Sequence, residues 1–208
     1  NISRRQPGVI GTKYTLYNKN IPITEIVLNV PGLHNVSNSV AAAAAAVQLG
    51  CSTESIKAGL EAFYGTGRRF ENKGEINGAL VIDDYAHHPT EIQATLSAAR
   101  EVAGNNKIYA VFQAHTYSRA LAFINDFAEA LKEADFVVVT DIFPAREKDP
   151  GTISGESMSE YFINKGINSK YISDFSETAA LLRYVAKKGD VIITLGAGDV
   201  NKVISKLI

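Results

Sequence analysis

Residues 68–208 predict an α/β fold with a mostly parallel sheet and helices on both of its faces. Four short apolar runs are typical of strands that are buried on both sides, at residues 79–82, 108–112, 136–140 and 191–195. Stretches of helical character lie between them, at residues 90–102, 119–133, 156–165 and 177–187. The second stretch has apolar residues three and four apart and predicts one buried stripe: Leu121, Ile124, Phe127, Ala128 and Leu131. Strands that alternate with helices of roughly 10–15 residues are typical of parallel sheets, so these patterns together indicate the class.

Residues 1–66 predict a separate and smaller arrangement of strands and helices. Short strands are expected in GVIGTKYTLY and EIVLNV, with the turn residues YNKNIP between them. One helix is expected at 35–49 and a second at 53–63, with Ser52 as the N-cap of the second. The segment YGTG at 64–67 has the composition of a linker.

The composition argues against several classes of protein. The chain has 208 residues with 21 basic and 22 acidic side chains, a formal charge of −1, which gives no electrostatic drive toward nucleic acid or an anionic membrane. No apolar run reaches the roughly 18–20 residues that span a bilayer, and NISRRQPGV at the N-terminus lacks the apolar core of a signal peptide. Cys51 is the single cysteine, so an internal disulfide is impossible. We therefore expect a cytoplasmic protein without a membrane or nucleic-acid partner.

The densest set of titratable side chains directly follows the first apolar run, at 79–82. The segment DDYAHHPTE, residues 83–91, holds two carboxylates, a phenol and two imidazoles ahead of a helix. Ligands of parallel sheets bind at the carboxyl ends of the strands, so this cluster predicts a binding site. Helix capping by His88 or Asp83 is the plainer interpretation of either residue alone, and zinc held by the imidazoles is a further alternative.

Two more polar segments follow strands at the same predicted edge. QAHTYSR, residues 113–119, places His115 and Arg119 one helical turn apart if the helix begins early. Arg119 offers a planar fork for a carboxylate or phosphate, and its charge near the start of a helix opposes the helix dipole unless an anion is bound. DIFPAREKDPG, residues 141–151, is a long loop whose charges fit ligand binding and solvation equally well.

Three weaker motifs complete the set. GAGD at 196–199 could present backbone N–H groups to an anion, although a tight turn fits it better. In GLHNVSN, Asn35 is expected to cap a helix and Asn38 to share its face. Arg68 and Arg69 in GRRFE have surface ion pairs as their plainer interpretation.

Together these segments resemble the Mur ligase family, and most closely its alanine-adding branch. The motifs GLHNVSN, GTGRRFE, DDYAHHPTEI, FQAHTYSRA and DIFPAREKDPGTISG occur in that order over almost the whole chain. The resemblance implies a ligase of peptidoglycan precursor synthesis that uses ATP and Mg²⁺. In such a ligase the carboxylate of UDP-N-acetylmuramate is activated as an acyl phosphate, which the amino group of L-alanine attacks.

The resemblance also implies roles for individual residues. Four match family positions that contact the nucleotide, with the aspartate at the ribose: Asn35, Asn38, Arg69 and Asp84. Four match positions around the incoming alanine and the reacting carboxylate: Tyr85, His87, His115 and Arg119. Arg119 is the candidate for the alanine carboxylate. Thr116 stands where the family often has a basic residue, and Ala120 where it often has a threonine.

The family's phosphate-binding loop, of the GxxGKT type, has no counterpart in the chain. The resemblance therefore implies that residues 1–66 end the central ATP-binding domain and that residues 67–208 form the Rossmann-like C-terminal domain. We expect this chain alone to be inactive in ligation. Two alternatives stay open, a ligase that joins a tripeptide to the same sugar acid in muropeptide recycling, and a stand-alone module that binds a nucleotide or an amino acid. A metal hydrolase that uses His87 and His88 is a more distant third.

Overall fold

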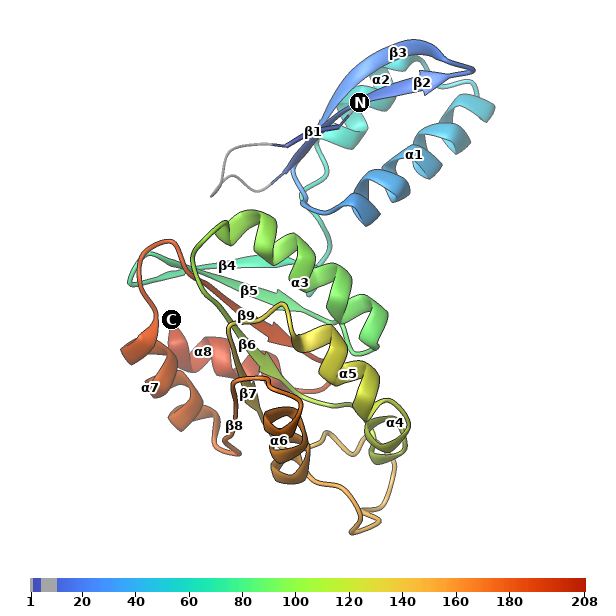
Figure 1. Ribbon diagram of the computed structural model, residues 1–208. Coiled ribbons are helices and arrows are strands. Elements are labelled where there is room, and N and C mark those ends of the chain that lie inside the picture. Colours follow the sequence, from blue (N-terminus) through green and yellow to red (C-terminus); the bar gives the residue numbers. More distant parts are fainter. Residues whose placement is uncertain (1, 5–10) are drawn as a thin grey trace. The chain divides into compact units, whose positions relative to one another are not determined.

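The computed structural model describes residues 2–4 and 11–208, which divide into two compact units (Figure 1). Unit 1 comprises residues 1–66 and unit 2 comprises residues 67–208. Most of NISRRQPGV, and the first three residues of GVIGTKYTLY, lie outside the described residues. No described helix is both long and apolar enough to cross a bilayer.

Unit 1 is a three-stranded antiparallel sheet with two helices. The sheet has the order β1-β2-β3. Its elements are β1 (Ile2–Arg4), β2 (Thr12–Asn18), β3 (Ile21–Leu28), α1 (Leu33–Gln48) and α2 (Thr53–Glu61). Lys19 and Asn20 join β2 to β3 with φ values of 47° and 68°, as a two-residue hairpin turn requires. The core of the unit joins β2 and β3 to both helices through Tyr14, Ile26, Ala43 and Ile56.

The two helices of unit 1 begin differently from each other. Ser52 caps α2 as the sequence predicts, and its hydroxyl accepts a hydrogen bond from the Ser55 N–H at 3.2 Å. The prediction that Asn35 caps α1 is wrong, because the cap is Gly32 and Asn35 lies inside the first turn. Gly32 has a φ of 92°, which lets the chain enter the helix earlier than a residue with a side chain would allow.

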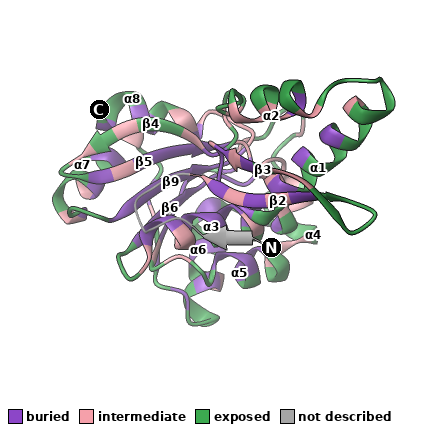
Figure 2. Cartoon of the chain, turned by 90° about the horizontal axis from the view of Figure 1, so that it is seen from above, coloured by how far each residue is buried: buried purple, intermediate pink, exposed green. Residues whose placement is uncertain are grey.

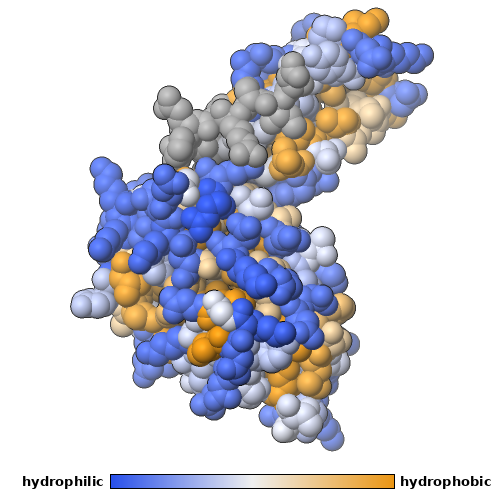
Figure 3. Space-filling view, viewed as in Figure 1, coloured by the Kyte–Doolittle hydropathy of each residue, from blue (hydrophilic) through white to orange (hydrophobic). Residues whose placement is uncertain are grey.

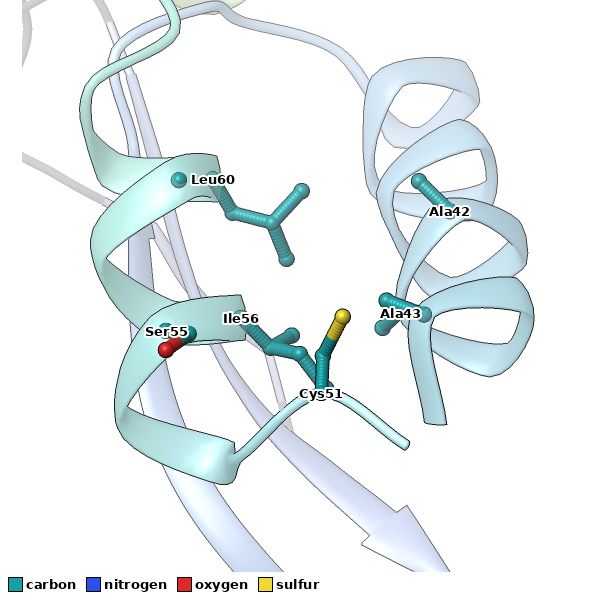
Figure 4. Close-up of a pocket in the computed structure, with 8 residues that line it drawn as sticks. Ala42, Ala43, Cys51, Ser55, Ile56 and Leu60 are labelled. Atoms are coloured by element: carbon teal, nitrogen blue, oxygen red, sulfur yellow. The ribbon is translucent and has the colours of Figure 1, made fainter. Parts of the chain in front are cut away.

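An apolar hollow of about 220 Å³ separates α1 from α2 (Figure 4). Alanines of α1 line one side, Ile56 and Leu60 of α2 line the other, and the sulfur of Cys51 points between the helices. Apolar residues also lie on the surface of α1, where Val40 and Val47 are exposed (Figure 3). This part of unit 1 therefore offers apolar surface but no cluster of polar groups.

Unit 2 is the predicted α/β fold. Its six-stranded sheet has the order β4-β5-β9-β6-β7-β8, in which β4 is antiparallel to β5 and every other pairing is parallel. The strands are β4 (Glu71–Ile76), β5 (Ala79–Asp84), β6 (Ile108–Phe112), β7 (Phe136–Val139), β8 (Ser169–Tyr171) and β9 (Val191–Leu195). The helices are α3 (Pro89–Ala103), α4 (Tyr117–Ala122), α5 (Ile124–Leu131), α6 (Gly155–Asn164), α7 (Phe175–Val185), the 3₁₀ helix η1 (Val200–Val203) and α8 (Ile204–Leu207).

Alternate residues of the central strands face two separate cores. Phe112 and Leu195 pack with α3, α5 and α6 on one face, while Val111 and Ile192 pack with α7 and α8 on the other. Figure 2 shows the result, since β5, β6 and β9 are buried along most of their length. The four predicted apolar runs are the four strands that this two-sided burial requires.

The expected helix at 119–133 is two helices, α4 and α5, that meet at Phe123. The N–H of Phe123 closes α4 on the carbonyl of Arg119, and its φ of −116° then turns the chain out of the helix. Its ring packs edge-on against Phe127, so the break is fixed by the core. The predicted stripe holds for α5, but Leu121 lies on the solvent side of the break and is 47% exposed.

The antiparallel edge strand β4 was not predicted. Its sequence ENKGEI is polar, because one face and one edge of the strand are open to solvent. A signal for it was present, since Asn77 and Gly78 form the turn to β5 with φ values of 55° and 77°. Asn-Gly is the preferred pair for such a turn.

Candidate functional site

The predicted polar segments leave the sheet at one edge. In the parallel register, Leu195 of β9 lies beside Asp84 of β5 and beside Phe112 of β6, which in turn lies beside Val139 of β7. The loops after these four strands therefore start side by side. Their side chains form the candidate site.

An aromatic cluster joins two of these loops. The rings of Tyr85 and His87 meet edge to face with centroids 5.4 Å apart, and the His87 and His115 centroids are 5.8 Å apart. His115 also stacks on Phe143 from the third loop, at 5.6 Å with 20° between the planes. The structure thus brings His87 and His115 together, as the site prediction requires.

Hydrogen bonds fix the orientation of the His87 ring. Its Nδ1 lies 3.0 Å from the carbonyl oxygen of Tyr85, which can only accept, so Nδ1 carries the proton. A Glu91 oxygen lies 3.4 Å from the same nitrogen and also accepts the backbone N–H of His87 at 3.1 Å. In the neutral ring, Nε2 is therefore the nitrogen that can accept a proton.

His88 caps a helix, which was the plainer interpretation of this residue. It is the N-cap of α3, its Nδ1 accepts from the Thr90 N–H at 3.4 Å, and its ring lies against Phe123. Within the part of the chain that the structure describes, no three His, Cys, Asp or Glu side chains lie close enough to hold a metal ion. The geometry therefore gives the zinc alternative no support from this pair.

The surroundings of His115 favour its neutral form. Its Nδ1 is buried and has no hydrogen-bond partner among the described residues. Burial lowers the pKa of His115, and the charges of His87 and Arg119 lower it further, against a smaller opposite effect of Glu147. The nearby guanidinium of Arg119 has no hydrogen bond or ion pair within residues 11–208. Among the described residues, a guanidinium without a bonded partner therefore lies near an imidazole whose pKa is lowered.

The backbone before Arg119 is strained. α4 begins at Tyr117, so His115 precedes the helix and does not share a helical turn with Arg119. Thr116 has a φ of 66° and a ψ of 144°, a region that costs a branched residue about 1–3 kcal/mol. Its N–H donates to the Phe143 carbonyl at 2.8 Å, and its hydroxyl accepts from the Arg119 N–H at 3.4 Å.

The third loop binds this strained segment. One oxygen of Glu147 accepts the Ser118 N–H at 2.9 Å, and the other accepts the Ser118 hydroxyl at 2.5 Å. These bonds lower the pKa of Glu147. The carboxylate of Glu147 is thus hydrogen-bonded to another loop of the protein, a structural role that neither interpretation of the 141–151 loop included. No local signal could have shown it, because Ser118 is far away in the sequence.

Arg68 is not the surface ion pair that the plainer interpretation suggested. Its Nε lies 3.1 Å from a carboxylate oxygen of Asp83, whose side chain is only 3% exposed. Its two terminal nitrogens donate to the carbonyls of Gly196 and Gly198, at 2.7 and 3.1 Å. Thr194 donates to the other Asp83 oxygen at 2.7 Å. Arg68 therefore fastens the glycine loop to the end of β5.

The GAGD segment is a bend between β9 and η1. The buried Gln113 amide donates to Asp199 at 3.0 Å, and its oxygen accepts the Val200 N–H at 3.0 Å. A Cβ on Gly198 would lie 2.3 Å from that amide oxygen and 2.6 Å from the ring of Phe143. The second glycine is required by close packing.

Asp84 organises the backbone beneath the cluster. It is 5% exposed, and its two oxygens accept the N–H groups of Phe70 and Ala86 at 2.8 and 2.7 Å. Burial raises the pKa of Asp84, against the lowering effect of those bonds. Arg69 is exposed, with its guanidinium 5.5 Å from the centre of the Tyr85 ring.

The two asparagines of the site prediction belong to unit 1. Asn38 is exposed on α1. Asn35 donates its side-chain amide to the Pro31 carbonyl at 2.7 Å. The remaining six predicted residues all belong to unit 2 and lie at or beneath the sheet edge.

Fold and site together define a class of protein, an α/β domain with two imidazoles and a guanidinium at the carboxyl ends of its strands, where parallel sheets bind their ligands. Residues 68–198 match the Mur ligase, glutamate ligase domain, and the chain belongs to the Mur ligase family.

Curated relatives agree with this assignment. The chain is 49% identical over 191 residues to the UDP-N-acetylmuramate–L-alanine ligase of Acetivibrio thermocellus, an alignment that covers 91% of this chain and 40% of that protein. It is 51% identical over 178 residues to the ligase of the same name from Lachnospira eligens, with 86% and 39% covered. The chain thus spans about two fifths of the length of these relatives.

Solved structures extend the comparison. The UDP-N-acetylmuramate-alanine ligase of Thermotoga maritima matches 99% of this chain with 44% of its own, at a TM-score of 0.81 and 29% identity. A murein peptide ligase from Psychrobacter arcticus matches at a TM-score of 0.62 and 24% identity, which shows the shared fold alone.

Proposed function

We propose that this chain is the C-terminal part of an ATP-dependent ligase that joins L-alanine to UDP-N-acetylmuramate in peptidoglycan precursor synthesis. In this proposal residues 1–66 end the central domain and residues 67–208 are the C-terminal domain. Support comes from relatives of that name at 41–51% identity. A cytoplasmic location belongs to the same proposal, because the substrates are a nucleotide sugar and ATP.

One observation carries the proposal: the convergence of His87, His115 and Arg119 at one sheet edge. Arg119 has no side-chain partner among the described residues, so its guanidinium is available to a substrate carboxylate as a two-pronged donor. The lowered pKa of the nearby His115 disfavours a competing positive charge there. The alanine ammonium must lose a proton before its nitrogen can attack the acyl phosphate. The unprotonated Nε2 of His87 is suited to receive that proton.

We assign the nucleotide side to the other end of the cluster. Arg69 and Tyr85 present an exposed cation and a ring to an anionic or aromatic ligand. Asp84 supports them through the backbone of its neighbours, and a ribose contact would use the remaining lone pairs of its carboxylate. For Asn35 and Asn38 of unit 1, the nucleotide role remains what the family resemblance implies.

The residues described here fit a substrate carboxylate and a nucleotide better than they fit Mg²⁺. No described group of three acidic or imidazole side chains could hold the ion. We therefore assign the Mg²⁺ ligands to other parts of the complete ligase and derive no step through the metal. When bound, the ion would neutralise the charge of the transferred phosphate.

The proposal is tested by steady-state kinetics of the complete ligase. Arg119→Ala should raise the KM for L-alanine roughly 10- to 100-fold, because a charge-assisted bond contributes about 1.5–3 kcal/mol. The KM for ATP should change much less. Arg119→Lys keeps the positive charge but lacks the planar fork, so its KM for L-alanine should lie between those of the wild type and Arg119→Ala. An unchanged alanine KM would move the carboxylate contact elsewhere, and a preference for the tripeptide over L-alanine would favour the recycling ligase.

A further inference from the structure

We infer that Glu147 is a positioning residue, whose carboxylate holds the first turn of α4, at Ser118 and Arg119, so that the Arg119 guanidinium stays free for a substrate carboxylate. The inference rests on the proposed function, because it assigns Arg119 to that carboxylate. It adds a residue from the 141–151 loop, which the sequence left undecided between binding and solvation.

The first argument is the geometry of the bonds. Both oxygens of Glu147 go to Ser118, one to the backbone N–H at 2.9 Å and one to the hydroxyl at 2.5 Å. The bond to the N–H holds the backbone of Ser118, and the bond to the hydroxyl holds its side chain. Ser118 directly precedes Arg119, so the direction of the Arg119 side chain depends on this contact.

The second argument is the strain beside it. Thr116 holds a positive φ that a branched residue adopts only when its surroundings impose it. The Phe143 carbonyl accepts a hydrogen bond from the N–H of Thr116. Glu147, from the same loop, accepts one from the N–H of Ser118, two residues after Thr116. Without Glu147 the turn can relax toward an ordinary backbone and carry Arg119 with it.

The third argument is that Glu147 forms no ion pair with the Arg119 guanidinium. Within residues 11–208 it forms no ion pair with a lysine or arginine, although its charge is felt at His115. A carboxylate near Arg119 that bonded to the guanidinium would block the substrate. By bonding to Ser118 instead, Glu147 fixes the turn and keeps the cation available.

The test uses Glu147→Gln in the complete ligase, with Glu129→Gln as the matched control. Glutamine keeps the size of the side chain but removes its charge and replaces one of the two accepting oxygens by an amide group that only donates. Glu129 is an exposed glutamate of α5, bonded to Lys132. We expect Glu147→Gln to raise the alanine KM about 10-fold while the KM for ATP and the melting temperature stay close to wild type. Glu129→Gln should leave all three unchanged.

A double variant separates this inference from the proposed function. If Glu147 acts through Arg119, Arg119→Ala with Glu147→Gln should be no worse than Arg119→Ala alone. Equal rises in the KM for alanine and for ATP, or additive effects in the double variant, would overturn the inference. If Arg119→Ala itself leaves the alanine KM unchanged, the proposed site fails. If Arg119→Ala raises the alanine KM but Glu147→Gln does not, the inference about Glu147 fails and the proposed role of Arg119 is kept.

Discussion

Replacing Arg68 by alanine should lower the stability of unit 2 more than replacing its neighbour Arg69 by alanine. The Arg68 side chain is 24% exposed and that of Asp83 is 3% exposed, so the pair is largely removed from water. Breaking a buried pair by removing one partner costs about 3–5 kcal/mol, because the remaining charge has lost its counterion. Thr194 remains as a donor to Asp83, which places the expected loss toward the lower end.

Thermal unfolding followed by circular dichroism measures this loss directly. At roughly 3 °C per kcal/mol for a domain of this size, the transition of unit 2 should fall by about 10 °C in Arg68→Ala. Arg69→Ala is the matched control, because that side chain is exposed, and its effect should stay within about 1 kcal/mol. A fall of less than 3 °C in Arg68→Ala, or equal falls in both variants, would refute the structural role given to Arg68.

Three further predictions concern burial and close packing. Burial raises the pKa of Tyr14 in the folded protein. Its contribution to the stability of unit 1 is therefore complete below the pKa of the unfolded chain, about 10, and is lost as the pH rises through the pKa of the folded state. Tyr14→Phe should abolish this loss of stability at alkaline pH in melting curves recorded at several pH values. The lowered pKa of His115 means that its ring titrates below about 6.5 in NMR and that its stabilising effect is lost as the pH falls; a value at or above 6.5 would contradict the buried environment. Gly198→Ala should destabilise unit 2 by about 1–3 kcal/mol in denaturant titrations, and a neutral effect would show that Gln113 and Phe143 can move aside.

The sheet of unit 2 was predictable because strands buried on both faces leave an unmistakable apolar run. Val191–Leu195 is such a strand, and its neighbours share the pattern. The edge strands lack it: Glu71–Ile76 is polar because it is half solvated, and Ser169–Tyr171 is too short to show a period. The break at Phe123 escaped prediction because it depends on ring packing between residues that the periodicity treats alike.

The site was predictable to the extent that its residues directly follow strands. His87, His115 and Arg119 stand where the parallel sheet must bring them together. The supporting contacts were not visible, since Glu147 reaches Ser118 and Arg68 reaches Gly196 across long stretches of chain. Asp84 was identified by the resemblance as a nucleotide contact, and its bonds to two backbone N–H groups appear only in three dimensions.

A crystal structure of the complete ligase with L-alanine and a nucleotide would test the central claim most directly. The account predicts the alanine carboxylate within about 3 Å of the Arg119 guanidinium, with the amino group toward His87. The nucleotide should lie on the side of Tyr85 and Arg69. An alanine bound away from the carboxyl edge of the sheet, with Arg119 free in the complex, would contradict the account.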